Sequence, residues 1–314
     1  MAKSHPHLSF VFPGQGSQQI GMLKAFEGSS LVNELFNTAS AAVGKNLWSI
    51  AQNGPAETLN DTVNTQPVLL TASVALWHLW QKETDITPKI IAGHSLGEYS
   101  ALVCAQALSL SDAAALVALR GKLMSDAVPK GQGAMAAVLG MEVEELAQVC
   151  EEAAQGEIVA PVNLNAPGQI VIAGNVAAVE RASALAKTKG AKKVIILPVS
   201  VPSHCLLMKD AASKLAKHLE SVKIQKPQIP VIHNVNVEIS AHPDDIRQCL
   251  VEQLYQPVRW IETVQRLNNE GIQFAVECGP GKVLCGLIKR TSPVIKPMGF
   301  EAPEELKTVL ESLA

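Results

Sequence analysis

A serine stands between two glycines in the pentapeptide GHSLG, residues 93–97, where a predicted strand (89–92) meets a predicted helix (96–107). A sharp strand-to-helix turn exposes the serine hydroxyl, and the glycines allow the strand and the helix to approach closely. Ser95 also lies at a helix N-terminus, where free N–H groups stabilise negative charge. The pattern predicts a nucleophile at Ser95 and an oxyanion donor at the Leu96 amide. The alternative is a strand-to-helix turn that the glycines merely shape.

A nucleophilic serine requires a base near neutral pH. His94 adjoins Ser95, but neighbouring side chains on a sharp turn diverge, which makes His94 a poor base. His204 follows Pro202 and Ser203 at the start of a predicted helix (202–219). There its side chain can project over the active edge of the large sheet and reach the serine. The alternative is a histidine at a helix start with no catalytic role.

An orienting carboxylate is missing from the place where α/β-hydrolases carry it, a strand-end loop between the serine and the histidine. Most acids in that interval fall on predicted helix faces or within a predicted inserted module. The sequence therefore predicts a Ser–His dyad whose histidine is held by a carbonyl oxygen. The acids concerned are Glu98, Asp112, Asp126, Glu142, Glu144, Glu145, Glu151, Glu152, Glu157 and Glu180.

Arg120 follows a run of apolar residues, 113–119, that covers every side of a predicted helix (112–127). Such a helix is buried, so the guanidinium must be paired or must reach water with its tip. One reading is a structural salt bridge or a charge at the emerging end of the helix. The other is a fork that binds a substrate carboxylate with two hydrogen bonds and leaves neutral acyl groups unpaired.

Two glycine-rich loops bear on nucleotide binding. The segment FPGQGSQ, residues 12–18, begins like a dinucleotide fingerprint, but Gln19 occupies the position of the third glycine. Its glycines can still present backbone N–H groups to an oxyanion. The loop GPGK, residues 279–282, lacks the phosphate-loop pattern because Val276 and Val283 stand where a glycine and a hydroxyl residue are needed. Nucleotide hydrolysis is therefore excluded.

Predicted strands and helices alternate along the chain, as in an α/β protein with a largely parallel sheet. Between residues 130 and 198 the order becomes βαββαβ, which is that of a ferredoxin-like module. The alternation resumes afterwards. We therefore predict a large catalytic domain of residues 1–129 and 199–314 with an inserted small subdomain of residues 130–198. Further predicted elements of the large domain include a helix at 67–81 and strands at 7–12, 229–232, 274–278 and 294–298.

The composition describes a globular protein: 47% of the 314 residues are apolar, 18% are charged and the formal net charge is −3. No overall positive field draws the chain to nucleic acid or to an anionic membrane. We find neither a secretory signal nor an apolar run of membrane-spanning length. The six cysteines form no C-x-x-C pair, so reduced thiols and a cytoplasmic location are expected, without a zinc site.

Taken in order, eight segments resemble the malonyl-CoA:acyl carrier protein transacylases of type II fatty acid synthesis, over almost the whole chain. Each segment is modestly specific, whereas their joint order is highly specific. The family fold is an α/β-hydrolase-like domain with a ferredoxin-like insert. The segments are FPGQGSQ (12–18), NTQP (64–67), GHSLGEYSA (93–101), the Arg120 helix, VNLNAPGQIVIAG (162–174), PVSVPSHC (198–205), QLYQPVRW (253–260) and GPGKVL (279–284).

The resemblance implies a role for individual positions. These are Ser95 as nucleophile, His204 as general base, Arg120 as the holder of the malonyl carboxylate, the amides of Gln15 and Leu96 as the oxyanion hole, the main-chain carbonyl of Gln253 as the group that orients the histidine, and Gln66 and Asn165 as pocket-lining residues.

The chain shows two differences from patterns found in the wider family. Polyketide-synthase acyltransferases that take malonyl units often carry HAFH ending at the histidine, whereas this chain has VPSH at 201–204, which favours the stand-alone enzyme. One departure from the family pattern is His233, where a second asparagine is expected before Val235.

The expected reaction is a ping-pong transfer of malonyl from malonyl-CoA to the phosphopantetheine thiol of acyl carrier protein, through an ester on Ser95. Both thioesters are substrates, so no cofactor and no metal are implied. We expect a monomer that binds malonyl-CoA and acyl carrier protein, and neither nucleic acid nor membrane. One alternative is a thioesterase or esterase with the same Ser–His site. The other is a non-catalytic carrier-binding subunit.

Overall fold

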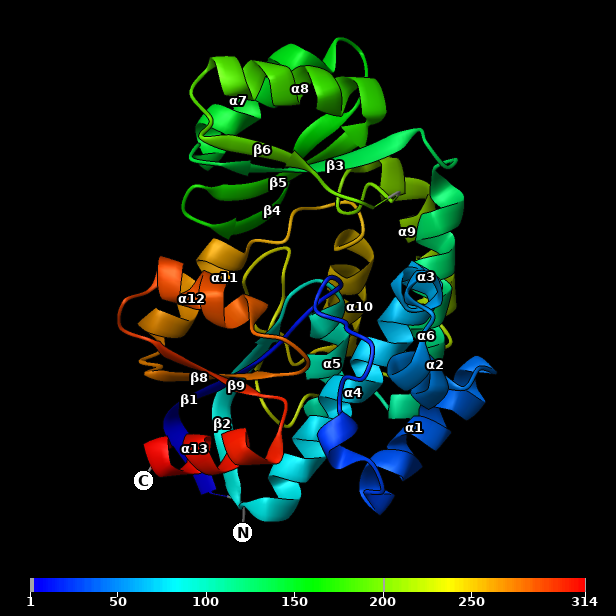
Figure 1. The fold of residues 1–314 in the computed structure, drawn as a ribbon, viewed down its shortest axis with the longest axis vertical. Helices are drawn as coiled ribbons and strands as arrows, with labels where there is room; N and C mark the ends of the chain where they lie inside the picture. Colours follow the sequence, from blue (N-terminus) through cyan, green and yellow to red (C-terminus); the bar gives the residue numbers. More distant parts are fainter. Residues whose placement is uncertain (1–2, 200, 314) are drawn as a thin grey trace.

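The computed structural model describes residues 3–199 and 201–313, and it contains two separate sheets (Figure 1). The larger sheet has five strands in the order β7-β2-β1-β8-β9, and every neighbouring pair runs parallel. Parallel strands are buried on both faces, and accordingly Leu8, Phe10 and Val11 are fully buried. The strands are β1 (Lys3–Phe12), β2 (Ile86–Gly93), β7 (Val231–Ile232), β8 (Phe274–Cys278) and β9 (Lys296–Phe300).

Helices cover both faces of this sheet, and neighbouring residues of β1 enter different cores. Phe10 belongs to a core built with α1 (Ser30–Val43), α4 (Thr62–Glu83), α5 (Leu96–Cys104), α6 (Leu110–Ala127), α9 (Lys209–Leu219) and α10 (Pro243–Glu252). Val11 belongs to a core built with α11 (Trp260–Asn269) and α12 (Val283–Thr291). Smaller elements complete the domain: η1 (Lys24–Phe26), α2 (Leu47–Asn53), α3 (Ala56–Asn60), η2 (Leu206–Met208) and α13 (Pro303–Leu313).

The smaller sheet is antiparallel, with the order β4-β5-β3-β6. Its strands β3 (Gly133–Leu139), β4 (Val159–Ala166), β5 (Gln169–Asn175) and β6 (Lys193–Ile196) alternate with α7 (Val143–Ala154) and α8 (Val176–Thr188). This is the predicted βαββαβ order, and the two helices pack on one face around their own core (Figure 1, top). The other face packs on Cys205. The chain therefore has an α/β-hydrolase-like large domain and an inserted ferredoxin-like subdomain. Their boundaries at 129/130 and 198/199 remain a prediction.

Several predicted boundaries differ from the observed ones by a few residues, among them those of β1, β2, α5, α6 and β9, and three elements show larger or more telling differences. α4 begins at Thr62, ahead of the predicted start at Pro67, because Asp61 caps it by accepting a hydrogen bond from the Val63 amide. The predicted helix at 202–219 begins only at Leu206 as η2 and continues as α9. Strand β7 is confined to Val231–Ile232 within the predicted 229–232.

None of the helices among the described residues combines the length and the apolarity that crossing a membrane requires.

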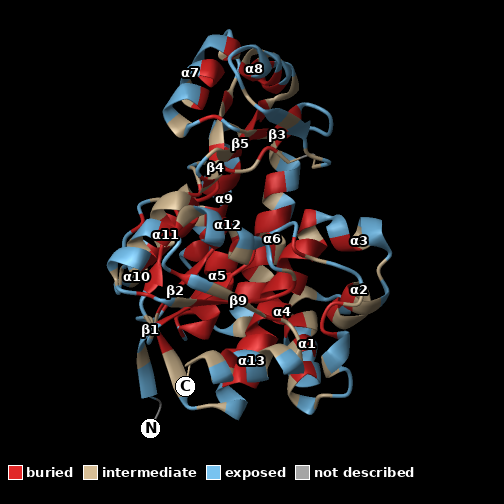
Figure 2. Cartoon of the chain, turned by 60° about the vertical axis from the view of Figure 1, so that its left-hand side comes forward, coloured by how far each residue is buried: buried red, intermediate tan, exposed pale blue. Residues whose placement is uncertain are grey.

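The turn from β2 to α5 depends on two glycines in tight contact. A Cβ on Gly93 would lie 1.9 Å from the Gly97 carbonyl carbon, and one on Gly97 would lie 2.0 Å from the Phe12 carbonyl oxygen. Every residue of α5 is buried (Figure 2). The helix thus begins directly against the ends of β1 and β2, which fixes the position of Ser95 between them.

We expect Gly97→Ala to lower the free energy of unfolding by about 3 kcal/mol, because backbone atoms cannot yield to the added methyl group. Gly286→Ala in α12 is the matched control, since nothing lies within 4 Å of its added Cβ. That control should stabilise the protein by roughly 0.5–1 kcal/mol, the ordinary gain of alanine over glycine in a helix. Urea unfolding of both variants measures the contrast. Equal stability of the two variants would contradict the close packing of the turn.

Candidate active site

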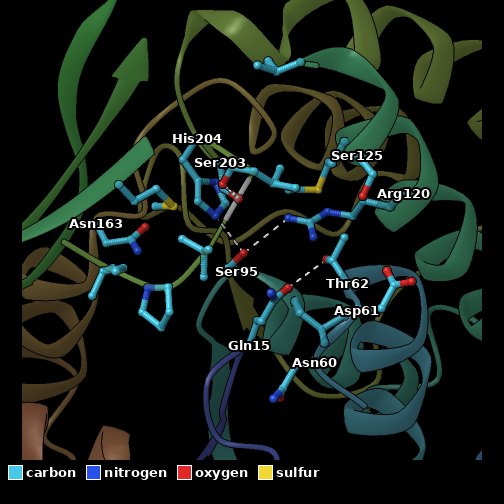
Figure 3. A pocket seen from close by; sticks show the side chains of 18 of the residues that line it. Gln15, Asn60, Asp61, Thr62, Ser95, Arg120, Ser125, Asn163, Ser203 and His204 are labelled. Carbon is cyan, nitrogen blue, oxygen red and sulfur yellow. Dashed lines mark hydrogen bonds between the residues drawn. The ribbon is translucent and has the colours of Figure 1, made fainter. Parts of the chain in front are cut away.

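Ser95 sits at the apex of the turn in a conformation that few side-chain-bearing residues adopt, with φ 52° and ψ −110°. Its amide donates a 2.7 Å hydrogen bond to Asn234 Oδ1, and Asn234 Nδ2 donates to the Gly93 carbonyl at 2.6 Å. A strained backbone persists only where its surroundings over-determine it. Asn234 therefore clamps the turn from outside, and the Ser95 hydroxyl points into a cavity (Figure 3).

His204 lies 2.8 Å from the serine, measured from its Nε2 to Ser95 Oγ. It stands in the irregular segment ahead of η2, with φ 64°, and its amide donates to the Leu254 carbonyl. Its Nδ1 lies 2.6 Å from the main-chain oxygen of Gln253. Because a carbonyl only accepts, Nδ1 carries the proton and Nε2 is left free to accept the serine proton. The structure thus brings together the predicted serine, base and orienting carbonyl.

Burial, and after it the nearby positive charge of Arg120, lower the pKa of His204 from 6.5 to about 3, against the opposing effect of the hydrogen bond to Gln253. A histidine with a depressed pKa stays neutral across the physiological range. It is therefore ready to act as a base on Ser95.

Arg120 is 2% exposed, and its guanidinium reaches the nucleophile. Nη1 donates to Gln66 Oε1 at 2.8 Å, while Nη2 donates to Gln253 Oε1 at 3.0 Å and to Ser95 Oγ at 3.3 Å. Gly121 allows this approach, because a Cβ there would lie 2.7 Å from the Thr62 carbonyl oxygen. All of these acceptors are uncharged. Because Arg120 is buried, its interpretation as a charge at the emerging end of a helix is wrong. Because its acceptors are uncharged, a substrate carboxylate is a natural partner for the guanidinium.

The two predicted oxyanion donors belong to residues that line the same cavity as the serine. A Cβ on Gly14 would come within 2.5 Å of the His94 carbonyl oxygen, so the loop that carries Gln15 lies directly against the turn. Within residues 3–199 and 201–313, neither the Gln15 amide nor the Leu96 amide donates a hydrogen bond to the protein. Both residues line the cavity. Two unused amides beside a nucleophile are what an oxyanion hole requires.

Gln66 and Asn165 are predicted to line the pocket, but neither lines the cavity. Each contacts a residue that does. Gln66 holds Arg120, as described, and is itself 1% exposed. Asn165 Oδ1 lies 2.8 Å from Nε2 of His94, a residue that does line the cavity. The His94 side chain thus points toward Asn165 and away from the serine hydroxyl. This confirms the prediction that neighbouring side chains on the sharp turn diverge.

The cavity has a volume of about 430 Å³ and lies between the two sheets. Met135 of β3 and Asn163 of β4 line it from the small subdomain, and Arg120 of α6 lines it from the large domain (Figure 3). A bridge between Asn163 and Val258 joins the two parts next to the site. The volume suits a small acyl group with part of a thioester arm.

Sequence reasoning missed a buried polar group behind the dyad. Glu98, one turn along α5 from the nucleophile, and His233, after β7, are both fully buried, with 2.7 Å between Oε1 and Nδ1. The sequence places the acids of this region mainly on predicted helix faces. The available signal was similar to the one that singled out Arg120, a single charge within a helix whose other residues are uncharged and mostly apolar.

Comparison with known proteins gives a consistent result. Residues 9–299 match the family model of the acyl transferase domain. The malonyl CoA-acyl carrier protein transacylase of Escherichia coli (strain K12) is 52% identical over 304 residues, which cover 96% of this chain and 98% of the relative. That of Bacillus subtilis (strain 168) is 47% identical over 308 residues, covering 98% and 97%.

Solved structures agree. The malonyl-CoA:acyl carrier protein transacylase of Xanthomonas oryzae has a TM-score of 0.97 at 49% identity, covering 99% of each chain. A malonyl-transacylase in complex with a type II polyketide synthase acyl-carrier protein has a TM-score of 0.96 at 50% identity, covering 98% of this chain and 99% of that one.

The match to the acyl transferase domain, on this fold and around a strained serine beside a histidine, places the protein among the acyltransferases. Within that class, the chain belongs to the malonyl CoA-acyl carrier protein transacylase family.

The depressed pKa of His204 predicts an unusual pH profile for acylation of Ser95. The active base is neutral, so activity is present above the folded-state pKa and falls only as the pH drops through it. We expect acylation to stay nearly constant from about pH 8 to about pH 5, below the ordinary histidine value of about 6.5. Rapid-quench intact-mass measurement of the acyl-enzyme gives the profile.

Arg120→Ala should move the acidic limb of this profile to higher pH, because a nearby positive charge is removed. Lys122→Ala on the same helix, an exposed residue paired with Asp126, should leave the limb in place. A wild-type inflection near the ordinary histidine value would refute the buried, neutral base.

Proposed function

We propose that this protein transfers the malonyl group from malonyl-CoA to the phosphopantetheine thiol of acyl carrier protein, by a ping-pong mechanism through a malonyl ester on Ser95. The observation that carries this proposal is the guanidinium of Arg120, which is buried 3.3 Å from the Ser95 oxygen and, among residues 3–199 and 201–313, donates only to uncharged acceptors. An acyl group with a terminal carboxylate completes that site, whereas a neutral acyl group leaves the charge unpaired.

In the first half-reaction His204 Nε2 takes the proton of Ser95 Oγ, and the oxygen attacks the thioester carbonyl carbon. The developing oxyanion is stabilised by the amides of Gln15 and Leu96. When the carbon–sulfur bond breaks, the CoA sulfur receives the proton from His204. The malonyl ester remains on Ser95, with its carboxylate on Arg120.

The second half-reaction reverses these steps with a different thiol. His204 takes the proton of the carrier's phosphopantetheine thiol, and the sulfur attacks the ester carbonyl carbon. The bond to Ser95 Oγ breaks, and the oxygen recovers its proton from His204. Gln253 keeps the imidazole in the required tautomer throughout, because its carbonyl accepts from Nδ1 in both directions.

Transfer to a thiol is favoured over the hydrolytic alternative by Arg120, since a hydrolase of neutral esters has no use for a buried cation. The complete set of serine, base and unused amides speaks against a carrier-binding subunit without activity. Similarity to a malonyl-transacylase solved with its acyl-carrier protein supports the carrier as acceptor.

We further propose that the protein acts as a cytoplasmic monomer, without a resident cofactor or metal and without binding nucleic acid. All groups of the proposed chemistry come from one chain. The six cysteines are free thiols, as in proteins of reducing compartments.

Mixing the protein with malonyl-CoA should give one malonyl adduct by intact mass, and Ser95→Ala should give none. The adduct should disappear on addition of the holo-carrier, with malonyl appearing on the carrier. The absence of an adduct on the wild type under all conditions would support the binding subunit. Faster release of free malonate than transfer to the carrier would support the thioesterase.

Arg120→Ala should reduce kcat/KM for malonyl-CoA by roughly 100-fold, the value of a charge-assisted pair of hydrogen bonds. Its ratio of malonyl-CoA to acetyl-CoA turnover should fall with it. Lys122→Ala should keep the wild-type ratio. Unchanged selectivity in Arg120→Ala would remove this residue from substrate recognition.

A further inference from the structure

Glu98 is a fully buried carboxylate that does not line the cavity, and the His204 ring is hydrogen-bonded to Ser95 and Gln253 and not to Glu98. Its Oε2 accepts hydrogen bonds from the Asn234 amide at 3.1 Å and from Gln253 Nε2 at 2.7 Å, and its Oε1 lies 2.7 Å from His233 Nδ1. The same Gln253 Nε2 donates to the Ser95 carbonyl at 3.0 Å. Glu98 is therefore joined to the site through one glutamine side chain.

The protonation states follow from the partners. Gln253 Oε1 must accept from Arg120, which has only donors, so its Nε2 must donate to Glu98. His233 Nε2 is buried without a partner among the described residues. Buried N–H groups without an acceptor are rarer in proteins than acceptors without a donor, so we place the proton of His233 on Nδ1, facing Glu98. Glu98 therefore receives donors on both oxygens and is ionised.

We propose that Glu98 is a positioning residue for malonyl selection, acting through Gln253 on Arg120; this inference rests on the proposed function. The carboxylate fixes which end of the Gln253 amide faces the arginine. Without it, Nε2 keeps only the Ser95 carbonyl and Asn234 Oδ1 as acceptors. The amide then turns more easily and presents Nε2 to the guanidinium, where two donors repel each other. Arg120 would then lose one of the acceptors that aim it at the Ser95 hydroxyl.

The arrangement also balances charge without occupying the arginine. A carboxylate in direct contact with Arg120 would compete with the substrate for the same N–H groups. Glu98 is one side chain away and supplies the opposite charge across Gln253, so the buried cation is compensated and stays available. His233 contributes by holding Oε1, which prevents the carboxylate from turning toward Arg120. An asparagine at 233 would offer a donor to Glu98 from a similar position.

The direct test is Glu98→Gln, which preserves shape but places an NH₂ group against a donor. We expect the malonyl-CoA to acetyl-CoA ratio of kcat/KM to fall at least about 10-fold, mainly through a higher KM for malonyl-CoA. In an Arg120→Ala background, the same substitution should leave the ratio unchanged, because its effect passes through the arginine.

Glu277→Gln is the matched control. Glu277 is also fully buried, and it accepts the amides of Leu284 and Cys285, away from the cavity. It should lower Tm without changing the ratio. A folded Glu98→Gln variant with wild-type selectivity overturns the proposal. So does an equal loss of selectivity in the Arg120→Ala background.

A second pair decides the case if Glu98→Gln does not fold. His233→Asn keeps a donor for Glu98 and should retain the wild-type ratio, whereas His233→Leu removes it and should lower the ratio. Equal ratios in these two variants would reject the positioning role. Failure of the proposed function is seen separately, as a wild-type enzyme that forms no malonyl ester.

Discussion

One residue, Gln253, holds both the base and the arginine of the site. Its main-chain oxygen accepts from His204, and its side-chain oxygen accepts from Arg120. The nitrogen of the same side chain donates to the Ser95 carbonyl. The relative placement of nucleophile, base and cation is thus set at a single position at the end of α10. The position of the base and the position of the arginine that would select the acyl group therefore both depend on Gln253.

The fold was largely predictable because its signals are local. The alternation of apolar strands with helices between Lys3 and Phe300 gave the parallel sheet, and the βαββαβ order gave the inserted module. Element boundaries were less certain where capping decided them, as with Asp61 at the start of α4. The sequence predicts a helix for the segment before η2, because nothing in its composition indicates the left-handed conformation of His204. In the structure the His204 amide donates to the Leu254 carbonyl, a contact with a residue far away in the chain.

Site residues could be predicted where the local sequence alone marks them. They could not be predicted where their role depends on residues that are distant in the chain. Ser95 stands in a turn motif, and Arg120 interrupts an apolar helix. Glu98 and His233 meet only in three dimensions, far apart in the chain. Periodicity does not pair them, and the same is true of Asn234, which clamps the strained turn by binding both Ser95 and Gly93.

The burial of Arg120 and Glu98 on opposite sides of Gln253 has an evolutionary consequence. Replacing the arginine alone, as a change of substrate to neutral acyl groups would require, leaves the buried carboxylate with its hydrogen bonds but without the nearby cation. The same substitution then lowers both the free energy of unfolding and the selectivity for malonyl groups. A lineage that acquires a new acyl preference is therefore expected to change positions 98 and 120 together, since each residue loses its charge partner when the other is replaced alone.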